Sequence, residues 1–165
     1  MTGAQKVDLF GVGVTVTDYA DATERIIAAA KDRRSYAVSA LATHGLTEAV
    51  RDPGFRQAVS SIDLVTPDGQ PVRWAMNALH GAGLGERVYG PDLTGHVCRR
   101  AAEEGVGVYL FGSTPQTCER FAAELRRRYP GIRIDGVQPD RFREATPGED
   151  AADVARINAS GAGVV

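Results

Sequence analysis

The stretch 64-LVTPDGQPVRWAMNALHG-81 places a short apolar run, a proline–glycine turn and a helical pattern in direct succession. Pro71 falls in the first helical turn, where its missing N–H leaves no hydrogen bond unmade. A strand, a tight turn and a helix in this order form the building unit of an α/β protein. The turn leaves one carboxylate, Asp68, at the carboxyl end of the strand, which is the edge of a parallel sheet where ligands bind.

The same succession of strand, turn and helix recurs along the chain. Strands are predicted over Val7–Val16, Tyr36–Leu41, Ile62–Val65, Val106–Phe111 and Ile132–Val137. Helices are predicted from a Thr17 or Asp18 cap to Asp32, and over Leu46–Arg51, Phe55–Ser60, Gln70–Leu79, Pro91–Glu104, Thr117–Tyr129 and Pro147–Asn158. This alternation predicts an α/β fold with substantial parallel pairing, so ligands are expected beyond the carboxyl ends of the strands.

Composition excludes several classes of protein. The chain has 165 residues, of which 43% are hydrophobic, so it is long enough for one domain with a sizeable core. A formal net charge of −2 argues against a nucleic-acid partner bound by bulk electrostatics. No apolar run approaches the roughly 20 residues that cross a bilayer, and the first residues lack a signal-peptide pattern, so a cytoplasmic location is expected. Cys98 and Cys118 lack the short spacing of a disulfide framework or a metal site.

Residues 163–165, Gly-Val-Val, have the character of the first residues of a buried strand. A strand that stops inside a parallel sheet leaves its neighbours unpaired. We therefore expect residues 1–165 to be a single domain that is incomplete at its C-terminal end. An open strand of this kind also favours self-association into a homo-oligomer. The alternative is a short edge strand at a natural terminus.

Asp68 has two interpretations. A carboxylate at a strand end beside a helix N-terminus can accept backbone N–H groups, as an N-cap or a turn residue does. The same position also suits a general base, which needs an ionised carboxylate within hydrogen-bond reach of the proton that it removes. The Pro-Asp-Gly motif by itself does not distinguish a cap from a base.

A second turn, in 110-LFGSTPQTCER-120, joins the strongest strand to an amphipathic helix. Free N–H groups at such a junction suit a phosphate, Gly112 allows close approach to the backbone, and Ser113 and Thr114 can add hydroxyl hydrogen bonds. An ordinary turn with a Ser or Thr cap explains these residues equally well. The P-loop pattern GxxxxGK[ST] is absent.

Arg87 and His44 are weaker candidates. Arginine pairs bidentately with phosphate oxygens, so Arg87 could hold a diphosphate, although most arginines are surface charges. His44 follows Thr43 in a predicted strand-end loop, and a lone histidine is more often structural than catalytic.

Taken in chain order, these motifs resemble the WecG/TagA/CpsF family of bacterial glycosyltransferases. The motifs are V-x-P-D-G at Val65–Gly69, R-V-x-G-x-D-L at Arg87–Leu93, G-V-x-L-F-G-S-x-P at Gly107–Pro115, L-R-R-R-Y-P-G at Leu125–Gly131 and I-x-G-V-Q-P-D-R-F at Ile134–Phe142. Each motif is modest alone, but their order and spacing extend the resemblance from about Val7 to Val165.

The resemblance implies a Rossmann-like α/β fold and a hexosyltransferase that moves N-acetylmannosamine or a related sugar from a UDP-sugar donor. The implied acceptor is a polyprenyl-diphosphate-linked sugar. Because this acceptor is anchored in the membrane, the resemblance implies that the chain binds peripherally at the inner face of the plasma membrane. Its products would enter teichoic acid, capsule or exopolysaccharide synthesis. The resemblance implies no metal and no other cofactor. Asp68 matches the family's proposed base, and Arg87 matches an arginine that engages the donor diphosphate.

Other positions of the motifs and loops are predicted to bind substrate. These residues are Ser39, Thr43, His44, Gly69, Arg87, Gly90, Asp92, Gly112, Ser113, Thr114 and Gln138. The chain departs from the family pattern where many members carry an asparagine, because Leu41 stands there; Thr43 and His44 are the candidates to replace it. The family also continues into a G-L-G-x-P-x-Q-E segment and a tail, which gives a second reason to expect an incomplete domain.

Two alternatives remain open at the level of sequence. The chain could be a catalytically inactive module that binds a nucleotide sugar, either because it is truncated or because Leu41 marks a divergent site. A weaker alternative is an α/β oxidoreductase. The first predicted strand contains Gly11-Val12-Gly13-Val14 but lacks the third glycine of a dinucleotide fingerprint.

Overall fold

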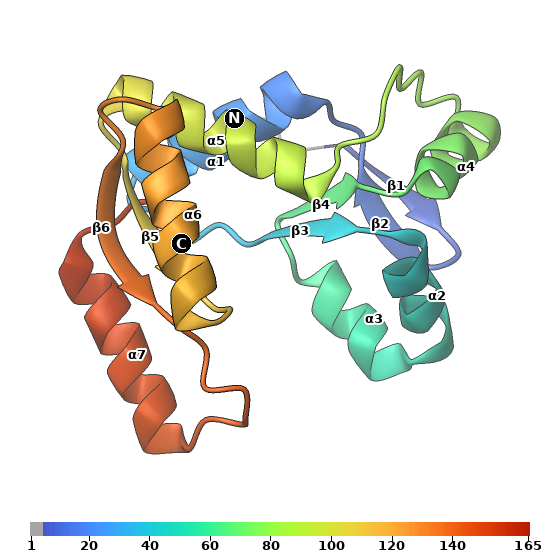
Figure 1. Ribbon diagram of the computed structural model, residues 1–165. Helices are drawn as coiled ribbons and strands as arrows, with labels where there is room; N and C mark the ends of the chain where they lie inside the picture. The colour runs from blue at the N-terminus through green and yellow to red at the C-terminus, as the bar shows by residue number, and fades with distance from the viewer. Residues whose placement is uncertain (1–4) are drawn as a thin grey trace. The chain divides into compact units, whose positions relative to one another are not determined.

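The computed structural model describes residues 5–165, which divide into two compact units. Among the described residues, the first unit comprises residues 5–26 and Ser35–His96, and the second comprises Ile27–Arg34 and Val97–Val165. Each unit combines helices with parallel strands, so the predicted α/β class is confirmed (Figure 1). The prediction of a single domain stays a prediction.

The elements follow one another much as the sequence pattern predicts (Figure 1). The strands are β1 Lys6–Leu9, β2 Val12–Thr15, β3 Val38–Leu41, β4 Leu64–Pro67, β5 Gly107–Phe111 and β6 Arg133–Gln138. The helices are α1 Tyr19–Lys31, α2 Thr43–Arg51, α3 Pro53–Ser60, α4 Gln70–His80, α5 Gly90–Glu104, α6 Pro115–Arg128 and α7 Pro147–Ser160. Among the described residues, no helix has both the length and the apolar character of a membrane span.

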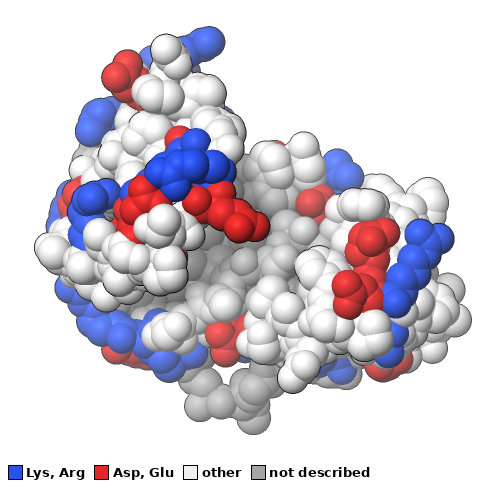
Figure 2. All heavy atoms as spheres, turned by 90° about the horizontal axis from the view of Figure 1, so that it is seen from below, with Lys and Arg blue, Asp and Glu red and all other residues white. Residues whose placement is uncertain are grey.

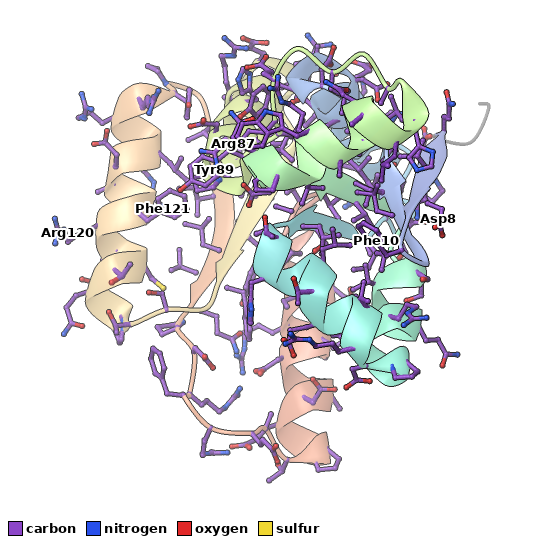
Figure 3. All side chains as sticks on the ribbon, turned by 90° about the vertical axis from the view of Figure 1, so that its right-hand side faces the viewer. Asp8, Phe10, Arg87, Tyr89, Arg120 and Phe121 are labelled. Atoms are coloured by element: carbon purple, nitrogen blue, oxygen red, sulfur yellow. The ribbon has the colours of Figure 1, made fainter. Side chains whose placement is uncertain are left out.

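The predicted strand Val7–Val16 is a β-hairpin, so this prediction was wrong in one respect. Strands β1 and β2 pair antiparallel, with Leu9 opposite Val12. The two residues between them, Phe10 and Gly11, have φ angles of 57° and 86°, the positive values that a two-residue turn of type I′ requires. Phe10 lies at the tip of this turn (Figure 3). The run of β-forming residues hid the turn, because only Gly11 marks it.

In the first unit, β3 and β4 lie side by side and run parallel, with Leu41 opposite Pro67. Both strands therefore end at the same edge. The core beneath them is formed by apolar residues from strands and helices of this unit. Its buried members are Leu9, Val12, Val14, Leu41, Leu46, Ala49, Val59, Val65, Val72 and Met76.

In the second unit, β5 and β6 pair parallel, and Tyr109 lies against Gly136. A Cβ on Gly136 would lie 2.1 Å from the ring of Tyr109, so only glycine fits there. On the other side of β5, the backbone N–H of Tyr109 donates to the carbonyl of Val164 at 2.8 Å. Val164 also forms an isolated parallel bridge with Val108, while the prediction that residues 163–165 begin a buried strand stays a prediction.

Charged side chains of opposite sign lie beside one another on the face that Figure 2 shows. Elsewhere, oppositely charged residues pair along one helix, as Arg100 and Glu104 of α5 do at 2.7 Å. Exposed pairs of this kind contribute little to stability.

A comparison of two substitutions in α4 tests the assignment of the first unit's core. Met76 is fully buried, whereas Leu79 on the same helix is 59% exposed. Met76→Ala should lower the free energy of unfolding by about 2–5 kcal/mol, because it leaves a cavity. Leu79→Ala should change it by no more than about 0.5 kcal/mol. Urea unfolding followed by circular dichroism measures both, and equal losses would show that this face of α4 is misassigned.

Candidate active site

Two helices start where β3 and β4 end. Strand β3 leads through Ala42 into α2, and β4 leads through Asp68 and Gly69 into α4. Helix α2 begins at Thr43, three residues before the predicted start, so Thr43 and His44 lie in its first turn and not in a loop. The predicted start at Leu46 is therefore wrong, because Gly45, a residue that disfavours helices, lies inside α2. In the structure Leu46 N–H donates to the Ala42 carbonyl at 3.0 Å, and Gly45 is held within the turn.

A third helix start is tied to the same edge by the segment that contains Arg87. The backbone N–H of Val88 donates to the carbonyl of Pro67 at 2.9 Å. The buried hydroxyl of Thr66 lies 3.4 Å from the Val88 carbonyl, to which it donates. These two hydrogen bonds attach the segment that contains Arg87 to the end of β4. In the sequence, Asp68 directly follows the bonded residue Pro67, and Arg87 directly precedes the bonded residue Val88.

Two glycines allow these helix starts to approach one another. A Cβ on Gly69 would lie 2.9 Å from the Thr43 hydroxyl and 3.1 Å from its backbone nitrogen. A Cβ on Gly90, the first residue of α5, would lie 3.1 Å from the Cβ of Ala40 and 3.9 Å from Oδ2 of Asp68. The first turns of α2 and α4 therefore lie against each other, and the start of α5 lies near the Asp68 carboxylate.

The helix starts make this edge attractive to an anion. The first N–H groups of a helix have no partner within the helix, and they carry its positive end. Neither Ala42, the N-cap of α2, nor Gly69, the N-cap of α4, provides a side-chain hydrogen bond to these groups. Such uncapped N–H groups suit a phosphate or a carboxylate.

Asp68 does not cap a helix. The N-cap of α4 is Gly69, and the half-buried carboxylate of Asp68 accepts no hydrogen bond from any described residue. Its backbone N–H donates to the Thr66 carbonyl at 3.0 Å. The capping interpretation is thereby excluded for this helix, and the carboxylate oxygens are available to a ligand.

Arg87 is likewise available. Its guanidinium lies over the ring of Tyr89, with 4.6 Å between the guanidinium carbon and the ring centroid (Figure 3). Within residues 5–165 the side chain of Arg87 makes no ion pair and no hydrogen bond, whereas many of the other arginines are paired with carboxylates. A cation–π contact fixes the position of a guanidinium and leaves its N–H groups able to donate.

Other residues predicted for the site lie around this edge in different ways. Asp92 is in the first turn of α5, and His44 is exposed in the first turn of α2. Ser39 alternates with Ala40 along β3, so its side chain points to the face opposite the one that meets Gly90. The roles of these residues in substrate binding stay predictions.

The second unit contains the turn with Gly112, Ser113 and Thr114. Gly112 and Ser113 have φ angles of 110° and 61°, so the turn is tight, and Thr114 is the N-cap of α6. The Thr114 hydroxyl accepts from the backbone N–H of Thr117 at 3.3 Å. The turn therefore has the hydroxyl cap that sequence offered as one explanation, and phosphate binding there stays a prediction.

Gln138 belongs to a buried polar network of the second unit. Its side-chain oxygen accepts from the hydroxyl of Tyr109 at 3.0 Å and from Arg156 at 2.7 Å, and its amide donates to Asp153 at 2.7 Å. Arg141 also pairs with Asp153. Since the polar atoms of Gln138 are already bonded, the structure shows it as a support of β6 and α7; a contact with substrate stays a prediction.

A model of the glycosyl transferase WecG/TagA/CpsF family matches residues 7–165. The chain belongs to this family. In a WecG/TagA/CpsF glycosyltransferase, the residues that the motifs single out can now be placed in space. Of the predicted set, Thr43, Asp68, Gly69 and Gly90 lie at one edge of the first unit, and the segment that contains Arg87 is hydrogen-bonded to this edge through Val88.

The sequence missed one residue of this site, Tyr19. Its hydroxyl accepts from the backbone N–H of Tyr89 at 3.0 Å, a contact between residues 70 positions apart. No local signal could have found this contact, because Tyr19 lies in no motif. Among the described residues no group of three or more His, Cys, Asp or Glu side chains is placed to hold a metal ion.

Replacement of Gly69 tests how closely the helix starts approach. Gly69 has a φ angle of −78°, so alanine fits its backbone, and the change is opposed by close contacts of the new Cβ, chiefly with Thr43 and also with Val72 at 3.4 Å. Gly69→Ala should destabilise the chain by about 1–3 kcal/mol, as overpacking does. Gly85→Ala is the matched control, since a Cβ there would meet nothing within 4 Å. If thermal unfolding gave the two variants equal midpoints, the close approach would be refuted.

The polar network of the second unit predicts a pH dependence. The Arg141 guanidinium, followed by the Gln138 amide, lowers the pKa of Asp153 from 3.8 to about 2. A lowered pKa in the folded state means that the carboxylate stabilises the fold above about pH 4, and that this stabilisation is lost as the pH falls toward 2. Asp153→Asn should lower the unfolding midpoint at pH 7 and flatten its decline between pH 4 and pH 2. Thermal unfolding across this range measures it, and a decline as steep as in the parent chain would contradict the assignment.

Proposed function

We propose that this family member transfers a sugar from a UDP-sugar to a polyprenyl-diphosphate-linked acceptor, with Asp68 as the general base. One observation carries the proposal: Asp68, whose carboxylate caps no helix, follows the strand end to which the Arg87 segment is hydrogen-bonded, at an edge where α2 and α4 start without side-chain caps. The two groups have opposite charges and opposite tasks. The carboxylate can take a proton, and the guanidinium with the N–H groups can hold an anion.

The donor diphosphate is the anion that this edge suits best. Its oxygens would accept from Arg87 and from the first N–H groups of α2, α4 and α5. Gly69 and Gly90 contribute by leaving room near the backbone, since a Cβ at either position would stand within 3.1 Å of a neighbour. Gly112, Ser113 and Thr114 are not needed for this arrangement.

The proposed reaction is a direct displacement at the anomeric carbon. An acceptor hydroxyl gives its proton to a carboxylate oxygen of Asp68, and the hydroxyl oxygen forms the new bond to the anomeric carbon. The bond from that carbon to the β-phosphate oxygen breaks, and UDP leaves with the electron pair. Attack from the face opposite the leaving group inverts the configuration.

Charge develops on the departing UDP as the bond breaks. Arg87 and the helix N–H groups are placed in advance, so they can offset that charge without rearranging, which is how an enzyme lowers the barrier electrostatically. In this proposal they do the work that a metal ion does in many other sugar transferases. An acceptor carried by a lipid further requires that the chain act at a membrane surface, and we propose the inner face of the plasma membrane.

A second candidate function is binding of a nucleotide sugar without transfer. Leu41 favours it, because this residue is only 3% exposed and belongs to the core, so it cannot contact a ligand. The position that carries asparagine in many relatives therefore gives no hydrogen bond to a donor here. Such a module would bind UDP and turn over no acceptor.

Asp68→Asn distinguishes the two candidate functions. The amide keeps the shape of the side chain but cannot accept the proton, so turnover of UDP-N-acetylmannosamine with a lipid-linked acceptor should fall about 10²- to 10⁴-fold. Binding of UDP, followed by calorimetry, should change little. The exposed Asp32 provides the control, since Asp32→Asn should leave both turnover and binding unchanged. If Asp68→Asn turned over as fast as the parent chain, Asp68 would not be the general base. If the parent chain bound UDP but transferred no sugar, the binding module would be favoured.

A further inference from the structure

The hydroxyl of Tyr19 joins the start of α1 to the segment that carries Arg87. It accepts from the backbone N–H of Tyr89 at 3.0 Å and lies 3.5 Å from Oδ2 of Asp92, to which it donates. A phenol has one hydrogen to donate, and here its donor and its acceptor are both used. The bonded N–H belongs to the residue just before α5, which has no helical partner of its own.

Tyr19 is itself held in place. Its ring stacks on His96, one turn further along α5, with 4.9 Å between centroids and an angle of 20° between the planes. At the start of α1, the carboxylate of Asp18 accepts from the backbone N–H of Asp21 at 2.8 Å and so caps the helix. Burial raises the pKa of the Tyr19 phenol, so the hydroxyl keeps the proton that it donates.

Tyr19 influences the position of Arg87 through Tyr89, which contacts both residues. The ring of Tyr89 is 37% exposed, so packing alone does not fix it, yet the guanidinium of Arg87 lies over this ring at 4.6 Å. Figure 3 shows the two side chains together. Because the Tyr19 hydroxyl fixes the backbone of Tyr89, the Tyr89 ring has a defined position. The Arg87 guanidinium that lies over this ring is therefore also held in a defined position.

We propose that Tyr19 is a positioning residue for donor binding: its hydroxyl fixes Tyr89, whose ring holds the Arg87 guanidinium ready for a diphosphate. This inference rests on the proposed role of Arg87 in the transfer reaction. Tyr19 touches no substrate. Its contribution is to reduce the ordering that Arg87 would otherwise undergo when the ligand binds.

Tyr19→Phe removes the hydroxyl and keeps the ring that stacks on His96, so the fold should survive. The affinity for UDP should fall about 3- to 10-fold, the range expected for the loss of one hydrogen bond. The affinity for uridine, which has no phosphate, should not change. Tyr129→Phe is the control, because the hydroxyl of Tyr129 has no partner among the described residues and its ring lies in the second unit.

A double-mutant cycle decides whether Tyr19 acts through Arg87. In an Arg87→Ala background, Tyr19→Phe should cause no further loss of UDP affinity. An additive loss, an equal loss of uridine affinity, or no loss at all in the single variant would each overturn the inference.

Hydrogen exchange separates this failure from failure of the proposed function. The Tyr89 amide should exchange several-fold faster in Tyr19→Phe than in the parent chain, without any ligand present. If the parent chain bound no UDP at all, the proposed function and the inference that rests on it would both fall, whatever the exchange data showed. If it bound UDP and Tyr19→Phe bound it equally well, only the role of Tyr19 would be lost.

Discussion

The hydrogen bond from the Val88 N–H to the Pro67 carbonyl, 2.9 Å long, is the contact on which the site depends. It attaches the segment that contains Arg87, which has no regular structure, to the end of β4, where Asp68 follows. The same attachment brings the start of α5 to the edge where α2 and α4 begin. In the proposed function, the carboxylate and the guanidinium are the two halves of one site, the first taking a proton and the second holding an anion.

The backbones at the starts of the helices lie so close to their neighbours that only small residues fit there. Gly69 and Gly90 stand where a Cβ would meet Thr43, Ala40 or Asp68 within 3.9 Å. The N–H groups of these helix starts add positive potential at this edge without many charged side chains. In the proposed function, this is how a chain with a formal net charge of −2 would bind a diphosphate. The charge that matters is local, and much of it belongs to the backbone.

Much of this site could be predicted from the sequence, and the features that could not be predicted depend on contacts or conformations that local sequence does not encode. The turn after β4 is encoded within five residues, so Asp68 was placed correctly at a strand end. Whether its carboxylate caps the next helix depends on the conformation of Gly69, which the sequence does not reveal.

Three other features could not be predicted from local sequence. The early start of α2 is one, because glycine signals a turn locally, while in the structure Gly45 continues the helix against Leu41. Tyr19 was missed because its contact spans 70 residues. The hairpin at Phe10 was missed because residues on both sides of it favour strands equally.

The most direct test of the account is a titration of UDP into the isotope-labelled chain, followed by the amide signals in ¹H–¹⁵N spectra. The account predicts that the largest changes fall on the first-turn amides of α2, α4 and α5, at and just after Thr43, Gly69 and Gly90. It also predicts that the changes weaken strongly in Arg87→Ala. Changes confined to Gly112–Thr114, or no changes at any concentration of UDP, would contradict the claim that the donor diphosphate binds beside Asp68.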